Sequence, residues 1–334
     1  MKPKKNINVL SIDGGGIRGV LPAEILVYVE EKLSEMYGKE TKIADHFDYI
    51  AGTSTGGILT CLYCIPDKDG NPKYSAKDAA NLYFNHGTKI FQKRVRWFLT
   101  LGGLITYRYS EKYIEMLFDK YFGDNKIKDS VKPFMVTSID TDSRDLYLFK
   151  SYKAKKDLKH NKFFKIAARA TSAAPSYFKP LQMFIESKNG IKELSLLDGG
   201  LAINNPAVSA VIEIPKIYKS FENINVLSIG TAPDERSYPY KKAKKWGIIS
   251  GATKLFNLSL TSTSDATHYQ MKELYDDHQV KGKYLRVQPN LYEADSKIDK
   301  ATKKNIRLLR EAGRKSVEDF KEQIDQFLED TNKH

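Results

Sequence analysis

Short apolar runs alternate with longer amphipathic segments along most of the chain. The short runs are bounded by polar or glycine-containing turns, which is typical of buried strands. They lie at residues 7–12, 47–51, 134–139, 145–150, 194–197, 225–230 and 284–287. The segments that predict helices repeat apolar residues at helical spacing. They lie at residues 22–37, 58–65, 76–86, 110–122, 162–171, 207–218 and 299–327.

This alternation of strands and helices predicts a parallel or mostly parallel sheet with helices on both faces. The expected fold is therefore an α/β three-layer sandwich. The sequence contains no internal repeat, no low-complexity tract and no Pro/Gly-rich linker that would divide it. We expect one domain over residues 1–334, with a core at about 6–231 and a C-terminal strand and helices at about 232–330 that pack on it.

The composition is that of an ordinary globular protein except in its charge. Of 334 residues, 41% are hydrophobic and 28% are charged, and no stretch approaches the ~18 consecutive apolar residues of a transmembrane helix. A basic N-terminus followed by a strand-like run predicts no secretory signal. The net charge of +13 favours an anionic partner, either a membrane surface, a nucleic acid or an anionic substrate. A solvated, lysine-rich surface explains the same charge.

The two cysteines, Cys61 and Cys64, are spaced as Cys-x-x-Cys. That spacing occurs in redox sites and in half of a zinc site. However, the sequence has no second pair, and both residues lie in the helix predicted at 58–65. We interpret them as small side chains that face the core. Two free thiols fit a reducing cytosol.

The strongest chemical signal lies at residues 49–59, Tyr-Ile-Ala-Gly-Thr-Ser-Thr-Gly-Gly-Ile-Leu. Its Gly-x-Ser-x-Gly pattern is that of a nucleophile elbow, in which a strand turns sharply into a helix and exposes a serine. The helix would direct its N-terminal amides and the positive end of its dipole at Ser54. A plain strand-to-helix turn, or a helix capped by Ser54 or Thr53, fits the pattern equally well. Partners elsewhere in the chain must decide between these interpretations.

A glycine-rich loop, Asp-Gly-Gly-Gly-Ile-Arg-Gly at residues 13–19, follows the first predicted strand and precedes a helix. It satisfies the Gly-x-Gly-x-x-Gly fingerprint of dinucleotide-binding proteins. That fingerprint also needs an acidic residue at the end of the second strand to hold the ribose. In this chain the second strand runs directly into the turn that carries Ser54. A nucleotide-binding α/β protein that uses residues 14–19 is therefore the second hypothesis.

The same loop is suited to an oxyanion hole, which is the first hypothesis. Acyl transfer needs hydrogen-bond donors fixed where the negative oxygen develops. Gly14, Gly15 and Gly16 supply amides without side-chain obstruction, and Arg18 adds a positive charge. Because the first two strands are expected to be neighbours, this loop and the serine turn should lie at the same edge of the sheet.

A serine nucleophile needs a base, and histidine is the usual one. None of the six histidines follows a strand and precedes a glycine turn: His46, His86, His160, His268, His278 and His334. Asp198 does, because it follows the apolar run at 194–197 and precedes two glycines. Partial burial would raise its pKa and make it a better base. Asp13, also at a strand end, is expected to hold its own glycine loop by hydrogen bonds.

Two further segments suggest contact with a membrane. Residues 90–105 begin with basic side chains, continue as an aromatic and glycine-broken apolar run, and include Trp97. They suit an interfacial contact or a lid, or equally a buried irregular segment. Residues 232–246 are predicted to be a loop, rich in lysine and ending at Trp246.

Taken together, the chain resembles the patatin-like phospholipase family over almost its whole length. The matching segments are Asp-Gly-Gly-Gly-Ile-Arg-Gly at 13–19, Gly-Thr-Ser-Thr-Gly-Gly at 52–57, Ala-Arg-Ala-Thr-Ser-Ala-Ala-Pro at 168–175 and Asp-Gly-Gly at 198–200. Weaker matches are Leu-Ser-Ile-Gly-Thr at 227–231 and Tyr-Leu-Arg-Val at 284–287. Four motifs in the family's order are far more specific than any one of them.

The resemblance implies a patatin-like fold and a lipid acyl hydrolase with a Ser-Asp dyad. Ser54 would be the nucleophile, Asp198 its base, and Gly14 to Gly16 the oxyanion hole with Arg18 beside it. The substrate would be an acyl ester of a membrane phospholipid, cleaved through an acyl-serine intermediate. No metal and no cofactor are implied. A catalytically inactive lipid-binding module is disfavoured because the serine and the aspartate are both present.

The resemblance also leads to expectations about type and place. The chain is expected to be of the bacterial, cytosolic type, located in the cytoplasm with peripheral association at the membrane, and to bind no nucleic acid. Some bacterial members of similar length are anti-phage effectors activated by a cyclic dinucleotide, so such an activator is a further hypothesis. The sequence leaves open the lipid head group, the acyl position, the choice among phospholipid, galactolipid and neutral lipid, and the oligomeric state.

Overall fold

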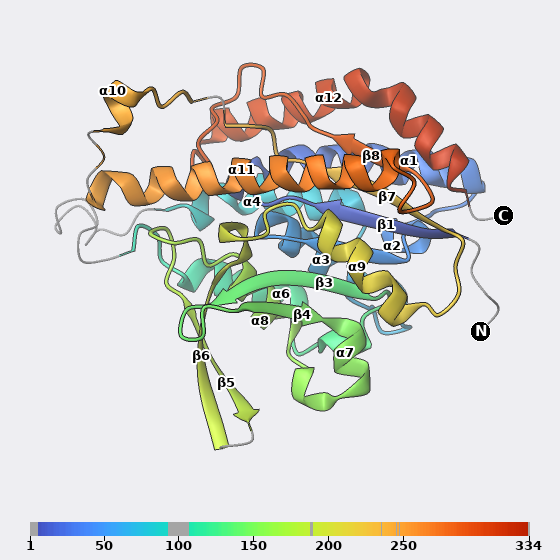
Figure 1. Ribbon diagram of the computed structural model, residues 1–334, viewed down its shortest axis with the longest axis horizontal. Coiled ribbons are helices and arrows are strands. Elements are labelled where there is room, and N and C mark those ends of the chain that lie inside the picture. Colours follow the sequence, from blue (N-terminus) through green and yellow to red (C-terminus); the bar gives the residue numbers. More distant parts are fainter. Residues whose placement is uncertain are drawn as a thin grey trace.

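The strands of the computed structural model form one eight-stranded sheet in the order β5-β6-β3-β2-β1-β7-β8, with β4 paired to β3 (Figure 1). The structure describes residues 6–92, 107–187, 190–234, 236–244, 246 and 248–332. The pairs β1–β2, β2–β3, β1–β7 and β7–β8 are parallel, and β3–β4, β3–β6 and β5–β6 are antiparallel. The strands are β1 (Asn6–Ile12), β2 (Tyr49–Gly52), β3 (Phe134–Asp140), β4 (Leu146–Lys150), β5 (Leu181–Ser187), β6 (Gly190–Asp198), β7 (Asn223–Ile229) and β8 (Tyr284–Val287).

Helices cover both faces of the sheet. The described α-helices are α1 (Val20–Tyr37), α2 (Ile43–His46), α3 (Thr55–Cys64), α4 (Ala76–Ile90), α6 (Lys112–Phe122), α7 (Ser151–Lys156), α8 (Phe164–Thr171), α9 (Ala207–Ile217), α10 (Tyr240–Ala243), α11 (Ile248–Asp276) and α12 (Lys303–Asp330). In Figure 1 most strands run across the picture, the β5–β6 hairpin extends downward, α11 lies roughly along the strands near α9, and α12 lies along the β8 edge. The expected three-layer α/β architecture with a mostly parallel sheet is confirmed.

The two layers arise from the alternation of side chains along each strand. In β1, Ile7 and Val9 pack with α9 and α11, whereas Leu10 and Ile12 pack with α1, α3 and α12 on the other face. Successive strand residues point to opposite faces. All four side chains are completely buried, as expected for a strand covered on both sides. The two polar residues of this run, Asn8 and Ser11, are also buried.

One edge of β3 determines where the functional loops lie. Val136 pairs with Gly52 of β2 and with Phe149 of β4, so β2 and β4 lie on opposite edges of β3. Ser138 pairs with β4 and also with Asp198 of β6, which places β6 on the same edge as β2. The carboxyl ends of β2 and β6 therefore meet from opposite directions along that edge, two residues of β3 apart.

The C-terminal part of the chain joins the same sheet and the same core. β8 pairs with β7 in parallel register, from Val226–Tyr284 to Ile229–Val287. α12 packs along α1, where Leu309 and Leu328 are completely buried. Residues 291–302 are irregular and connect β8 to α12.

Several elements differ from the sequence-based expectation. β5 was not predicted, because most of its side chains are partly or fully exposed in a hairpin with β6 that projects from the body (Figure 1). The predicted strand 194–197 is the end of the longer β6. α11, a helix of 29 residues, was not among the helices predicted from the apolar repeat. The helix predicted at 299–327 begins later, at α12, where the Thr302 side chain caps it.

The cysteine interpretation agrees with the structure, since Cys61 and Cys64 are buried and free on α3. Burial raises the pKa of both thiols well above the ordinary range. Among the described helices, none is both long and apolar enough to cross a membrane. The segment interpreted as a lid or interfacial contact, residues 90–105, lies outside the described residues from 93 onwards.

Candidate active site

Ser54 sits at a sharp turn between β2 and α3. Its backbone has φ 53° and ψ −121°, a strained conformation for a residue with a side chain. The first turn of α3 packs directly on β1, where a Cβ added to Gly56 would meet the Ile12 carbonyl oxygen at 2.2 Å. The Ser54 amide donates a hydrogen bond to Thr171 Oγ1 at 2.8 Å. This is the geometry of a nucleophile elbow.

The Ser54 hydroxyl donates a hydrogen bond to Asp198 Oδ2 at 2.6 Å. The second carboxylate oxygen, Oδ1, accepts the amide of Gly200 at 2.8 Å. The backbone of Asp198 is fixed as well, because its amide donates to the Ala173 carbonyl at 3.0 Å. The carboxylate is thus oriented by main-chain contacts on both sides, with one oxygen aimed at the serine.

Burial is the main influence on the pKa of the Asp198 carboxyl group. The residue is completely buried, and this burial raises its pKa from 3.8 to about 7. The hydrogen bonds from Ser54 and Gly200 act in the opposite direction. A carboxylate with a pKa near neutrality is a stronger base than an ordinary one and is still ionised in part at pH 7.

Ser54 and Asp198 both line a predominantly apolar cavity of about 680 Å³. The cavity extends between α3, α4 and α6, which contribute Ile58, Leu82 and Leu117. No histidine lines it within the part of the chain that the structure describes. The cavity is chemically suited to a hydrocarbon chain whose carbonyl end lies at the serine.

The glycine loop borders this site, but its three amides are not equivalent. The Gly14 amide already donates to the Asn204 carbonyl at 3.2 Å, which differs from the expectation that it is available to a substrate. The amides of Gly15 and Gly16 have no acceptor among the described residues. Gly16 lines the cavity with Ser54, at φ +60°, where a Cβ would meet the Ile298 carbonyl oxygen at 2.3 Å.

Arg18 lies on the other side of the loop. It is 3% exposed and lines a separate small cavity of about 250 Å³ with Asp13 and Thr231. Burial lowers its pKa to about 10, and its Nε and Nη1 have no hydrogen-bond partner. The sequence placed this arginine beside the oxyanion hole. The structure places its side chain at this second cavity, which shares the lining residue Leu260 with the Ser54 cavity.

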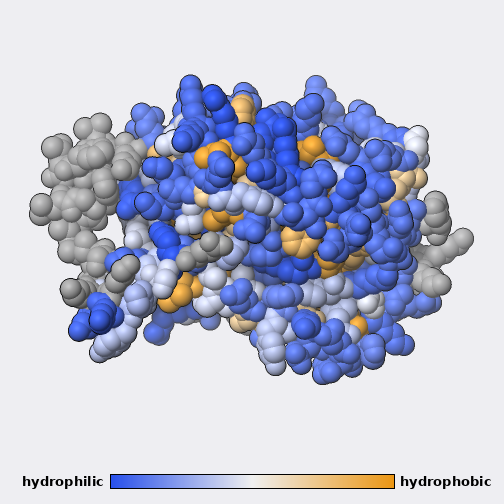
Figure 2. Space-filling model, turned by 90° about the horizontal axis from the view of Figure 1, so that it is seen from above, coloured by the Kyte–Doolittle hydropathy of each residue, from blue (hydrophilic) through white to orange (hydrophobic). Residues whose placement is uncertain are grey.

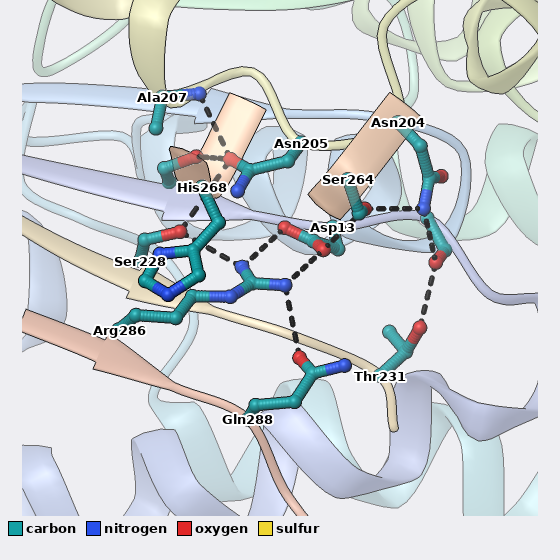
Figure 3. Close-up of polar contacts among 12 residues, drawn as sticks. Asp13, Asn204, Asn205, Ala207, Ser228, Thr231, Ser264, His268, Arg286 and Gln288 are labelled. Carbon is teal, nitrogen blue, oxygen red and sulfur yellow. Dashed lines mark hydrogen bonds and ion pairs between the residues drawn. The ribbon is translucent and has the colours of Figure 1, made fainter. Parts of the chain in front are cut away.

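A buried ion pair supports the glycine loop from behind (Figure 3). Arg286 of β8 donates to both oxygens of the Asp13 carboxylate, at 2.8 and 2.6 Å. Ser264 of α11 donates to the same carboxylate at 2.8 Å. Asp13 was expected to hold its own glycine loop by hydrogen bonds, but its carboxylate instead binds an arginine 273 positions further along the chain.

Other side chains of this network fix the loop directly. Thr231 Oγ1 donates to the Gly14 carbonyl at 2.7 Å, and the Ile17 amide donates to the Ile298 carbonyl at 2.8 Å. Asn204 Nδ2 donates to Ser264 Oγ at 3.0 Å (Figure 3). No sequence motif predicted a role for these residues. A charged residue inside the apolar run at 284–287 was a usable signal, because a buried arginine needs an anionic partner.

The described residues contain no group of three or more His, Cys, Asp or Glu side chains that could hold a metal ion. The end of β2, where a nucleotide-binding protein would carry its ribose-binding acid, is occupied by the Ser54 turn. The nucleotide-binding alternative is therefore not favoured.

An α/β sheet that presents a serine–carboxylate pair at the edge of an apolar cavity has the features of a serine esterase. The family model described as "Patatin-like phospholipase" matches residues 10–211. The chain belongs to the patatin-like phospholipase family, and it is a lipid acyl hydrolase. The fold is patatin-like.

Individual relatives agree with this assignment. Patatin-like protein 1 of Arabidopsis thaliana is 34% identical over 93% of this chain and 81% of its own length. Patatin group M-2 of Solanum tuberosum is 31% identical over 93% of this chain and 84% of its own. Among solved structures, VipD of Legionella pneumophila matches at 13% identity and a TM-score of 0.33, over 94% of this chain and 67% of that one. That last likeness is too low to bear on fold or function.

The buried ion pair leads to a prediction about stability. Replacing Arg286 by Met leaves the Asp13 carboxylate buried without its cation, and we expect the free energy of unfolding to fall by about 3–5 kcal/mol. The measurement is urea unfolding followed by tryptophan fluorescence. The double variant Asp13→Asn/Arg286→Met should lose less than the sum of the single losses, because no buried charge remains.

The matched control is Arg314→Met. Arg314 also pairs with an acid, Glu24, but its side chain is 63% exposed, so the loss should be at most about 1 kcal/mol. Equal losses for Arg286→Met and Arg314→Met would contradict a structural role for the Asp13–Arg286 pair.

Proposed function

We propose that this enzyme hydrolyses the fatty-acyl esters of membrane phospholipids, with Ser54 as the nucleophile and Asp198 as its base. The observation that carries the proposal is the 2.6 Å hydrogen bond from Ser54 Oγ to a carboxylate buried at the edge of an apolar cavity. A serine hydroxyl is a weak nucleophile until a base within hydrogen-bond reach takes its proton.

The acylation step follows from this contact. Ser54 Oγ attacks the ester carbonyl carbon while its proton passes to Asp198 Oδ2. Collapse of the tetrahedral intermediate breaks the bond to the lipid alcohol, and Asp198 returns the proton to that leaving oxygen. Deacylation repeats the sequence with water as the nucleophile, and it releases the fatty acid and restores the Ser54 hydroxyl.

The oxyanion of each tetrahedral intermediate would be stabilised by backbone amides. Gly15 and Gly16 offer N–H groups without an acceptor among the described residues, and the N-terminus of α3 adds its positive dipole end. One such donor typically contributes about 10²–10³-fold to kcat. The Gly14 amide already donates to the Asn204 carbonyl, so Gly14 would not be a donor. Its role would be to let the loop approach Ser54, because a Cβ at this position would meet Ser54 Cβ at 3.0 Å.

We further propose a cytoplasmic enzyme that associates peripherally with the membrane. The support is the pair of buried free thiols and the net charge of +13. Figure 2 shows one face of the molecule with mainly hydrophilic side chains and only scattered apolar ones. Attraction through this face would therefore be electrostatic. The bacterial type and an activating cyclic dinucleotide stay predictions.

The dyad is tested by two conservative substitutions. Ser54→Ala and Asp198→Asn should each lower kcat on a phospholipid by at least about 10³-fold, because each removes one member of a unit that acts together. Phospholipid hydrolysis is measured by release of free fatty acid. Far-ultraviolet circular dichroism and the melting temperature should show that both variants remain folded.

A fluorophosphonate ester gives an independent readout. Mass spectrometry should find the label on Ser54 in the wild-type chain and no label in Ser54→Ala, while Asp198→Asn should react more slowly. Labelling of a different serine, or near-normal turnover by Asp198→Asn, would show that the pair is not the catalytic dyad.

The raised pKa of Asp198 predicts a pH dependence. The carboxyl group acts as a base only when it is ionised, so kcat/KM should fall as the pH is lowered through about 7 and level off above that value. A water-soluble ester such as p-nitrophenyl butyrate allows this measurement without a change in a lipid surface.

Glu30 on α1 provides the control, because burial raises the pKa of this carboxyl group to about 7 as well. It accepts the amides of Ile43 and Ala76, away from the cavity. The variant Glu30→Gln should keep the same midpoint. A midpoint near 4, or one that shifts only in Glu30→Gln, would remove Asp198 from the role of base.

The membrane proposal has its own test in co-sedimentation with vesicles. Binding to vesicles that contain phosphatidylglycerol should exceed binding to vesicles of pure phosphatidylcholine. It should weaken as the salt concentration is raised, because screening by salt reduces the range of electrostatic attraction. Binding independent of both lipid charge and salt would contradict it.

A further inference from the structure

A second, larger hollow adjoins the Ser54 cavity and has a distinct charge. It measures about 1390 Å³, and we call it the basic vestibule. Its cationic lining residues are Arg108, Arg236, Lys254, Lys297 and Lys300. Among the lining residues that the structure describes, Asp299 is the single acid. The hollow is therefore a candidate site for an anion.

The positive charge of the basic vestibule is not a general property of the surface hollows. The polar hollow at the β8 edge has three cations, Lys272, Lys283 and Arg286, against two acids, Asp276 and Asp330. The hollow between α1 and α12 balances its Lys and Arg residues with glutamates in equal number. Concentration of cations in a concave site raises the local potential and attracts anions.

Part of this charge is compensated and part is not. Arg108 pairs with Asp299 at 2.6 Å, and Arg236 pairs with Asp234. Lys254, Lys297 and Lys300 form no ion pair with an acid in the described portion of the chain. These lysines therefore leave a net positive charge after the internal pairs are accounted for.

The basic vestibule and the Ser54 cavity share a wall made by Phe91, Tyr177 and Ile298. The Arg108 guanidinium lies over the Tyr177 ring, 5.3 Å from its centroid. Ile298 lies between Lys297 and Asp299, with Lys300 next in the chain. Its carbonyl accepts the Ile17 amide of the glycine loop at 2.8 Å. The basic side chains are thus attached to the same short segment that supports the loop beside Ser54.

Two orphaned polar atoms in the same lining also point to a ligand. The hydroxyl of Tyr238 and Oδ1 of Asn257 are buried and have no hydrogen-bond partner. Buried polar groups in proteins nearly always have a partner, so these two atoms are available to a ligand that enters the hollow. A tyrosine hydroxyl can donate to a phosphate oxygen, as can the lysine and arginine side chains around it.

We propose that the basic vestibule binds the phosphate diester of the substrate's head group while the acyl ester lies at Ser54. This rests on the proposed hydrolysis of lipid esters and narrows its substrate: the enzyme prefers anionic phospholipids to galactolipids and neutral acylglycerols. The apolar cavity takes the acyl chain, and the charged hollow on the other side of Tyr177 and Ile298 takes the head group.

The test uses monomeric substrates, so that attraction to a charged surface plays no part. Dihexanoyl phosphatidylglycerol and dihexanoylglycerol are supplied below their critical micelle concentrations, and kcat/KM is measured for each. The readout is the ratio of the two values, anionic over neutral. It is compared between the wild-type chain and Lys297→Gln/Lys300→Gln.

We expect the double variant to lower this ratio about tenfold, because two charge-assisted contacts to phosphate are lost. Adding Lys254→Gln should lower it further. The matched control is Lys68→Gln/Lys321→Gln, which removes the same charge from exposed positions that line neither hollow. Its ratio should equal that of the wild type. Melting temperatures check that all variants are folded.

Inhibition by a soluble head group distinguishes binding of the lipid head group from binding of a free anion. Glycerophosphoglycerol should inhibit hydrolysis of the phospholipid competitively, and more weakly in Lys297→Gln/Lys300→Gln. If inorganic phosphate binds without competing with the lipid, the hollow is a site for a free anion and the head-group assignment is overturned.

The remaining outcomes distinguish this proposal from the one on which it rests. If the wild-type chain hydrolyses both esters and the variants show the same ratio as the wild type, head-group binding in the basic vestibule is refuted. The proposal of the Ser54–Asp198 dyad is then unaffected. A wild-type chain that hydrolyses neither ester would instead refute the proposed lipid hydrolysis, and the vestibule assignment with it.

Discussion

The site depends on the way two strands share one edge of β3. β2 runs parallel to β3 and ends at Gly52 opposite Val136, while β6 runs antiparallel and ends at Asp198 opposite Ser138. Thr137 lies between these two positions, and its hydroxyl forms a hydrogen bond with Thr53 at 2.8 Å. The approach of the two strand ends from opposite directions is what brings a hydroxyl 2.6 Å from a carboxylate.

The same arrangement explains why Asp198 has unusual chemistry. The carboxyl group is enclosed by the sheet and by the segment after α8, and no cation is among the influences on its pKa. Burial without a compensating charge disfavours ionisation, whereas hydrogen bonds from Ser54 and Gly200 favour it. The balance leaves the group basic enough to take a proton and ionised enough to do so near neutrality.

The C-terminal part of the chain contributes to the site although it carries neither Ser54 nor Asp198. Arg286 of β8 fixes Asp13 at the start of the glycine loop, and Ile298 supports the loop at Gly16. The family match ends at residue 211, so these supports lie beyond it. Gly14, Gly15 and Gly16 have no side chains that could stabilise the loop, so the contacts that hold it come from other segments.

By itself, the sequence determined the α/β pattern and the residues at its strand ends, because apolar periodicity and glycine turns are local features. It predicted that Ser54 and Asp198 lie at the same edge of the sheet, where the structure joins them by a hydrogen bond. Tertiary structure alone decided which amides remain available, that Arg18 faces a separate cavity, and that Asp13 pairs with Arg286. It also decided the position of β5 and the length of α11. These features depend on contacts between segments far apart in the chain, and no local pattern of residues encodes the partner of a buried charge.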